Sequence, residues 1–138
     1  MNNQKKERLL HWIDEDRDKL IDFFRCFIQA KSPNPPGDTR AAVKHISQFL
    51  DEQKLPYKII ASKEEMPNVV GAFECGAPGR HLVLNGHIAV FPVDDTEGWT
   101  YEPWSATIAK GRIYGRGAAD MKCGTSALIF TFSYLHRI

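Results

Sequence analysis

The sequence predicts an α/β fold, in the form of a partial three-layer α/β/α domain whose sheet is flanked by helices. Three observations favour this class. Residues 7–30 and the segment after Asp38 carry apolar side chains at helical spacing. Short segments rich in β-branched residues and bounded by Pro or Gly follow them. The last segment, residues 125–138, is again helical in pattern and is almost entirely apolar.

The N-terminal part is expected to form two amphipathic helices. SPNPPGD (32–38) ends the first one, because proline cannot continue a helix and Gly37 permits a turn. Asp38 is the expected N-cap of the second helix, which Pro56 closes. The apolar positions of the first helix are Leu10, Ile13, Leu20, Phe24, Phe27 and Ile28. Those of the second are Ala42, Val43, Ile46, Phe49 and Leu50.

Three short segments, residues 57–60, 68–73 and 81–85, are expected to be strands. The run of apolar residues at 82–84 predicts that the third strand is buried on both faces. Functional groups in α/β sheets gather beyond the carboxyl ends of the strands. His87 lies just beyond the end of this third strand, and this position makes it the first candidate for a functional residue.

The C-terminal part is expected to hold one more strand region and one helix. A polar and aromatic loop (94–105) precedes a strand region at 107–114, with a turn at Lys110-Gly111. The helix at 125–138 has no polar face, and a helix of this kind is buried on every side. The chain offers little after it to cover it, so an incomplete domain is expected.

Composition places the chain among ordinary soluble domains. It has 138 residues, 43% of them hydrophobic and 25% charged, which suits one domain with its own core. The formal net charge of +1 and the lack of like-charged blocks argue against a nucleic-acid or membrane partner. The first residues do not resemble a signal peptide, and a cytoplasmic protein is expected. Cys26, Cys75 and Cys123 are too scattered for a disulfide framework or a thiolate zinc site.

Neither of the two candidate functional residues is decisive alone. A lone histidine such as His87 is most often a hydrogen-bonded structural residue, and Asp120 equally suits a helix N-cap. GRIYGRGAADMKCG (111–124) is not a phosphate loop, because glycine does not precede Lys122 and Ser or Thr does not follow it. It is not a dinucleotide motif either, because Asp120 takes the place of the third glycine.

Taken together, the motifs are more specific. HLVLNGHIAVFP (81–92), Trp99, Pro103-Trp104 and GRIYGRGAADMK (111–122) resemble the N-terminal catalytic segment of one zinc hydrolase family. Its members include acetylornithine deacetylase, succinyl-diaminopimelate desuccinylase, aminoacylase and glutamate carboxypeptidase. The resemblance runs from the first expected helix to the last residue. It therefore implies a zinc-peptidase-like domain of which residues 1–138 are the N-terminal part.

The resemblance also implies a chemistry. His87 would bind one zinc and Asp120 would bridge two, and cobalt or manganese would also suit these ligands. Two close metals polarise a carbonyl and generate hydroxide, so the implied reaction is hydrolysis of an amide in an N-acyl amino acid or small peptide. A homodimer is implied only for a full-length form, because the family's dimerisation domain lies further along the chain.

Position 89 departs from the family pattern. The family has His-x-Asp here, and its aspartate holds the ring of the ligand histidine, whereas the side chain of Ala89 has no oxygen. Loss of such a support typically costs about 10–100-fold in metal affinity or activity. Asp94 and Asp95 lie beyond Pro92, so neither is a clear replacement. The sequence is compatible with a natural loss of the aspartate and with an engineered one.

The family's general-base glutamate, its neighbouring glutamate ligand, a further acidic ligand and a final histidine would all follow this segment. His87 and Asp120 alone give a zinc too few protein ligands for a catalytic site. A truncated, inactive hydrolase is therefore expected. The alternative is a non-catalytic interaction protein that docks on a full-length relative through an exposed helix and an open sheet edge. The charged residues Glu64, Glu65 and Lys122 are expected to be solvated.

Overall fold

The structure is a computed structural model, and it describes residues 3–76 and 78–138. The described residues form four α-helices, two β-hairpins and one irregular helical turn. The N-terminal elements are α1 (Asn3–Glu15), α2 (Arg17–Gln29), α3 (Arg40–Glu52), β1 (Tyr57–Ile60) and β2 (Asn68–Gly71). The C-terminal elements are β3 (Thr107–Ala109), β4 (Arg112–Tyr114), the turn Ala118–Lys122 and α4 (Cys123–Arg137). Helices thus pack beside small antiparallel sheets, and the predicted α/β class is confirmed.

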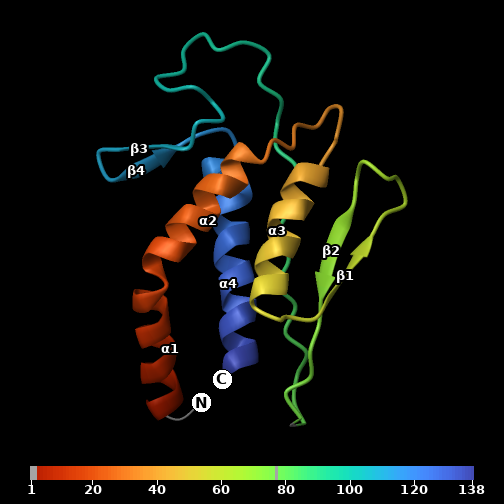
Figure 1. The fold of residues 1–138 in the computed structure, drawn as a ribbon, viewed down its shortest axis with the longest axis vertical. Coiled ribbons are helices and arrows are strands. Elements are labelled where there is room, and N and C mark those ends of the chain that lie inside the picture. The colour runs from red at the N-terminus through yellow and green to blue at the C-terminus, as the bar shows by residue number, and fades with distance from the viewer. Residues whose placement is uncertain (1–2, 77) are drawn as a thin grey trace.

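The core lies where α2, α3 and α4 meet. α4 runs between α2 and α3, and the β1–β2 hairpin lies on the outer side of α3 (Figure 1). Phe23 of α2 contacts Phe49 of α3 and Phe130 of α4, with ring centroids 5.0 and 5.6 Å away. The rings of Phe49 and Phe130 stack at 4.7 Å. These three aromatic rings join three helices, and they fix the position of α4, whose first turn carries part of the candidate site.

The first helix differs from its prediction. Residues 7–30 form two helices that are separated at Asp16, and α1 has no buried residue. Leu10 and Ile13 are 51% and 44% exposed, because α1 turns a different face toward the core. The remaining apolar positions, in α2, are buried as expected at Phe24, Phe27 and Ile28. The periodicity thus predicts the buried face of α2 but not that of α1, where Leu9 and Trp12 pack against the core and Trp12 stacks on Tyr134 of α4 at 6.5 Å.

The apolar face predicted for the second helix is confirmed, because Ala42, Val43, Ile46, Phe49 and Leu50 are all buried in α3. The predicted cap is wrong by one residue. Thr39 is the N-cap, and Asp38 lies one position earlier. Its carboxylate accepts a hydrogen bond from the Arg40 main-chain nitrogen at 3.1 Å and pairs with the Arg40 guanidinium. The aspartate therefore still satisfies a main-chain donor at this helix start.

The third predicted strand does not form. β1 and β2 pair antiparallel, with Tyr57 opposite Gly71, and they form a sheet of two strands. Residues 81–85 are extended but are not hydrogen-bonded into a sheet, and Leu82 and Val83 are 65% and 75% exposed. The prediction of a strand buried on both faces is therefore wrong for these residues. The physical reason is the absence of an adjacent strand within the part of the chain that the structure describes.

The second hairpin and the last helix are confirmed. β3 and β4 pair antiparallel around a turn at Lys110-Gly111, where both residues have positive φ values of 50° and 72°. α4 covers the predicted C-terminal helix and starts two residues earlier than expected, at Cys123. None of the described helices is long and apolar enough to cross a membrane.

Candidate metal centre

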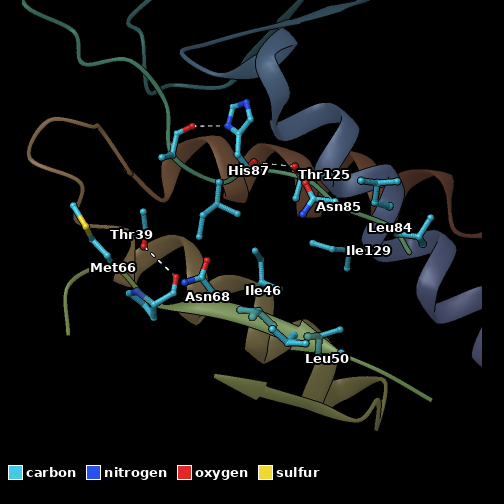
Figure 2. Close-up of a pocket in the computed structure, with 18 of the residues that line it drawn as sticks. Thr39, Ile46, Leu50, Met66, Asn68, Leu84, Asn85, His87, Thr125 and Ile129 are labelled. Carbon is cyan, nitrogen blue, oxygen red and sulfur yellow. Dashed lines mark hydrogen bonds between the residues drawn. The ribbon is translucent and has the colours of Figure 1, made fainter. Parts of the chain in front are cut away.

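The main chain around His87 is anchored on two sides. The Thr125 hydroxyl, in the first turn of α4, donates a hydrogen bond to the His87 carbonyl at 3.0 Å (Figure 2). Gly86 permits this approach, since a Cβ atom there would lie only 2.7 Å from Thr125 Oγ1. On the other side, the Ser32 hydroxyl donates to the Ile88 carbonyl at 2.6 Å. The backbone that carries His87 is therefore fixed although it belongs to no regular strand.

The His87 ring has a hydrogen-bond partner in the main chain of residue 89. Nδ1 of His87 lies 2.8 Å from the Ala89 carbonyl oxygen, and because a carbonyl only accepts, Nδ1 carries the proton and donates it (Figure 2). Alanine at this position therefore does not leave the His87 ring without a hydrogen-bond partner. The main chain provides the oxygen that the side chain lacks, and a bond of this kind fixes the tautomer of a ligand histidine.

Asp120 lies in the irregular turn between β4 and α4. Its φ and ψ of −127° and 102° are not helical, and α4 begins only at Cys123, so the N-cap interpretation of Asp120 is wrong. Gly117, at φ 75°, starts the turn in a left-handed conformation that favours glycine. The Lys122 amide closes it with a hydrogen bond to the Gly117 carbonyl at 2.9 Å. This turn projects the Asp120 side chain outward, where it is 85% exposed.

The structure brings the two candidate ligands together. Nε2 of His87 lies 3.0 Å from Oδ1 of Asp120, although the residues are 33 positions apart. Because Nδ1 is the donor to Ala89, the Nε2 atom of a neutral ring has a lone pair facing the carboxylate. Two acceptors at this distance repel each other unless a proton or a cation lies between them.

The donor set suits a metal ion. Zinc binds imidazole nitrogen and carboxylate oxygen at about 2.0–2.2 Å, which at a tetrahedral angle separates the two atoms by about 3.4 Å. The observed 3.0 Å between His87 Nε2 and Asp120 Oδ1 differs from this by a few tenths of an ångström. A shift of that size is within reach of a carboxylate that is mostly exposed. The two residues therefore fit as part of a zinc site.

The candidate site has two candidate ligands, His87 and Asp120, among the described residues. No cluster of three His, Cys, Asp or Glu side chains able to hold a metal occurs in residues 3–76 and 78–138. Asp95, one of the two nearby carboxylates in the sequence, accepts a hydrogen bond from the Glu97 amide at 3.1 Å within its own loop. A zinc bound to His87 and Asp120 alone would need ligands from elsewhere to complete a catalytic coordination shell.

Lys122 differs most from its prediction. It was expected to be solvated, but it is fully buried, with 0% of its surface exposed. Its ammonium donates to the carbonyls of Phe27 and Ala30, at 2.7 and 2.8 Å, and lies over the Phe27 ring. Burial lowers its pKa to about 7. Glu64 and Glu65 are exposed, as expected.

A cavity borders the His87 segment. It measures ≈ 640 Å³, and Ile46 and Leu50 of α3 and Ile129 of α4 contribute to its lining. Figure 2 shows these apolar side chains directed into the space, whereas the His87 ring points away from it. The lining includes the His87 segment itself but no Asp, Glu or Cys, so the cavity offers the candidate metal centre no further ligand of these types.

Two residues that hold the site could not be found from the sequence. Ser32 and Thr125 each bond to a carbonyl beside His87, across 56 and 38 residues of chain. Neither belongs to a motif with a known spacing. A buried serine and a buried threonine are also common in ordinary helices and turns, so their hydroxyls carry no sequence signal.

Comparison with known proteins agrees with this geometry. Residues 83–138, which include both candidate ligands, match the sequence profile of Peptidase family M20/M25/M40. An N-formyl-4-amino-5-aminomethyl-2-methylpyrimidine deformylase of Halalkalibacterium halodurans is 33% identical over 94% of this chain and 31% of its own length. A succinyl-diaminopimelate desuccinylase of Sulfurimonas denitrificans is 35% identical over 80% of this chain and 28% of its own length.

A further desuccinylase, succinyl-diaminopimelate desuccinylase 2 of a Ruegeria species, is 32% identical over 92% of this chain. The match covers 30% of that enzyme. The chain therefore spans less than a third of the length of the curated relatives that it matches.

Proposed function

Because this chain belongs to peptidase family M20/M25/M40, we propose that it forms the N-terminal part of the metal site of an amide-cleaving hydrolase. The substrate class is small N-acylated compounds, such as N-acyl amino acids or small peptides. Relatives named for the removal of a formyl or a succinyl group support this choice. Three exposed free thiols, at Cys26, Cys75 and Cys123, support a reducing, cytoplasmic setting.

The observation that carries the proposal is the approach of His87 Nε2 to Asp120 Oδ1 at 3.0 Å. In this proposal His87 binds one zinc and Asp120 bridges a pair, with cobalt or manganese as substitutes. The metal pair, when bound, polarises the scissile carbonyl and makes water a nucleophile at neutral pH. The Ala89 carbonyl fixes the ring so that Nε2 presents its lone pair to the metal.

We further propose that a polypeptide of these 138 residues is inactive by itself. Among the described residues, no third His, Cys, Asp or Glu joins His87 and Asp120 in a group that could hold a metal ion. A catalytic zinc generally has three protein ligands and one open position. The remaining ligands and the base would come from sequence equivalent to the other two thirds of the relatives, and dimer formation would belong to that longer form.

The test compares activities in a complete chain that carries this segment. Purified protein is assayed for release of amino acids from N-acetyl, N-formyl and N-succinyl substrates, before and after chelation and with zinc restored. His87→Ala and Asp120→Asn should each abolish metal-dependent turnover. Full activity of either variant would contradict the proposed roles. Zinc-dependent turnover by the 138-residue polypeptide would contradict its proposed inactivity.

A second candidate function is a non-catalytic interaction with a full-length relative. The feature that favours it is the outer edge of β2, which among residues 3–76 and 78–138 pairs only with β1 and borders the ≈ 640 Å³ cavity. An unpaired edge of this kind accepts an added strand. Mixing the 138-residue chain with a full-length relative should then give a stable complex, and two separate peaks in size-exclusion chromatography would exclude it.

A further inference from the structure

The candidate site has two arms that meet at one place. The first arm is the segment that carries His87, and the second is the turn that carries Asp120. Neither arm belongs to a regular strand or helix, so the distance between the two ligands depends on what each arm is attached to. Both attachments lead to residues 27–34, which form the end of α2 and the segment after it and which we call the anchor.

The Asp120 arm reaches the anchor through Lys122. The carbonyls in the last turn of a helix have no partner within the helix, and a cation there is favoured by the helix dipole. Lys122 donates to two such carbonyls, those of Phe27 and Ala30. Its own carbonyl accepts a hydrogen bond from the Ser126 hydroxyl at 2.7 Å, so both ends of the lysine are fixed.

The His87 arm reaches the anchor through Ser32. This serine is fully buried, and its hydroxyl donates to the Ile88 carbonyl. Its carbonyl accepts from the Val90 amide at 3.0 Å, and the Val90 carbonyl accepts from the Asn34 amide at 2.8 Å. Three hydrogen bonds thus tie the residues that directly follow His87 to the anchor.

The two arms also touch each other beside the anchor. A Cβ atom at Gly117, where the Asp120 turn begins, would lie 2.4 Å from Cγ1 of Val90 in the His87 arm. Only glycine allows this approach, and its φ of 75° points to the same requirement. The arms are therefore packed without a gap between their attachment points.

We propose that Lys122 and Ser32 are positioning residues that set the separation of His87 and Asp120 by holding both arms on the anchor. This role rests on the proposed metal-site function. Lys122 touches neither the metal nor the substrate in this proposal, because its ammonium faces the carbonyls of α2. It acts through the turn Ala118–Lys122, which carries Asp120 two residues before it.

The test uses the 138-residue chain and two variants, with one for each arm. Lys122→Met keeps the length of the buried stem and removes its donors, and Ser32→Ala removes one hydroxyl. The matched control is Thr39→Val, which removes a buried hydroxyl that donates to the Pro67 carbonyl at 3.4 Å; Thr39 lies away from the His87 ring (Figure 2). Unfolding midpoints are measured for all four proteins, and the variants are compared under conditions where each is fully folded.

Two readouts distinguish positioning from a general loss of stability. Zinc affinity should fall at least about fivefold in both variants. The expected loss is smaller than the roughly 10–100-fold loss that is typical when a group bonded directly to a metal ligand is removed. In the metal-free chain, the His87 Nε2 resonance should move in Lys122→Met by more than the Nδ1 resonance, because the Ala89 partner stays in place. Thr39→Val should change neither quantity, even where its unfolding midpoint falls as far.

The outcomes separate this inference from the function on which it rests. If both arm variants match Thr39→Val in zinc affinity and in the His87 resonances, the positioning role is wrong while the metal site stands. If the unmodified chain binds no zinc, the proposed metal site fails, and the metal-free resonances alone decide whether Lys122 and Ser32 position the pair. If Lys122→Met does not fold, the zinc affinity of Ser32→Ala decides whether the anchor positions the two ligands.

Discussion

The Ala89 carbonyl oxygen accepts a hydrogen bond from Nδ1 of His87 at 2.8 Å. This bond gives the ring the support that the family's aspartate provides two residues after the histidine. It also leaves Nε2 as the free nitrogen, opposite Asp120. We therefore expect that alanine at this position does not by itself prevent His87 from acting as a ligand.

Restoring an acidic side chain at position 89 should consequently have a modest effect. In a complete chain with this segment, we expect Ala89→Asp to raise zinc affinity and kcat/KM by less than about tenfold, below the usual range for such partners. The main-chain bond already fixes the tautomer of His87. Calorimetric zinc titration and steady-state assays of both forms measure the effect. A gain of a hundredfold would show that the carbonyl is a poor substitute.

Gly86→Ala should disturb the segment that carries His87 and lower the stability of the fold. Its Cβ would meet Thr125 Oγ1 at 2.7 Å and break the hydrogen bond from that hydroxyl to the His87 carbonyl. Crowding of this kind costs about 1–3 kcal/mol. Gly79→Ala is the control, because a Cβ there meets no atom within 4 Å. Urea unfolding of both variants tests the prediction, and equal stabilities would contradict the tight contact.

The core aromatic rings should dominate stability. Phe130→Ala removes a ring that is 2% exposed and packs on Phe23 and Phe49, and we expect it to cost about 3–5 kcal/mol. Phe91 is 77% exposed, so Phe91→Ala should change stability by less than about 0.5 kcal/mol. Thermal and urea denaturation of the two variants provide the comparison. Similar losses would mean that α4 is not held by this cluster.

Stability should fall in mild acid because of His45. Burial against Phe23 and Phe27 lowers its pKa below 6.5, although the Phe23 carbonyl accepts a hydrogen bond from Nε2 and opposes this. Between the folded and unfolded pKa values the unfolded chain binds more protons, so stability rises with pH in this window. The contribution of His45 is complete above pH 6.5 and is lost as the pH falls through the folded pKa.

The measurement is the free energy of unfolding between pH 5 and pH 8. His45→Gln should flatten the curve in this interval, and His11→Gln, at an exposed position of α1, is the control variant. An unchanged slope in His45→Gln would assign the pH dependence to another group.

Part of this fold follows from local pattern. The buried face of α3 and the turn at Lys110-Gly111 depend on short-range periodicity and on backbone preference, and both are as predicted. The strand expected at 81–85 depends on a neighbouring strand, which the described residues do not supply. A run of apolar residues indicates a need for burial, but it does not provide the partner.

At the candidate site, too, some features could be predicted from the sequence and others could not. The motifs predicted that His87 and Asp120 belong together, and the structure brings them within 3.0 Å. The Ala89 carbonyl was missed because residue types describe side chains, whereas this acceptor belongs to the main chain. Lys122 was missed because a buried lysine is rare. Its burial depends on two carbonyls more than 90 residues away in the sequence.

The central claim is that His87 and Asp120 are two ligands of one metal ion. Its most direct measurement is a zinc titration of the 138-residue chain, followed through the two ring nitrogens of His87 by NMR. We predict that zinc shifts the Nε2 resonance, leaves the proton on Nδ1, and binds at least about tenfold more weakly to Asp120→Asn. An unshifted Nε2 resonance, or equal zinc binding by Asp120→Asn, would contradict the claim.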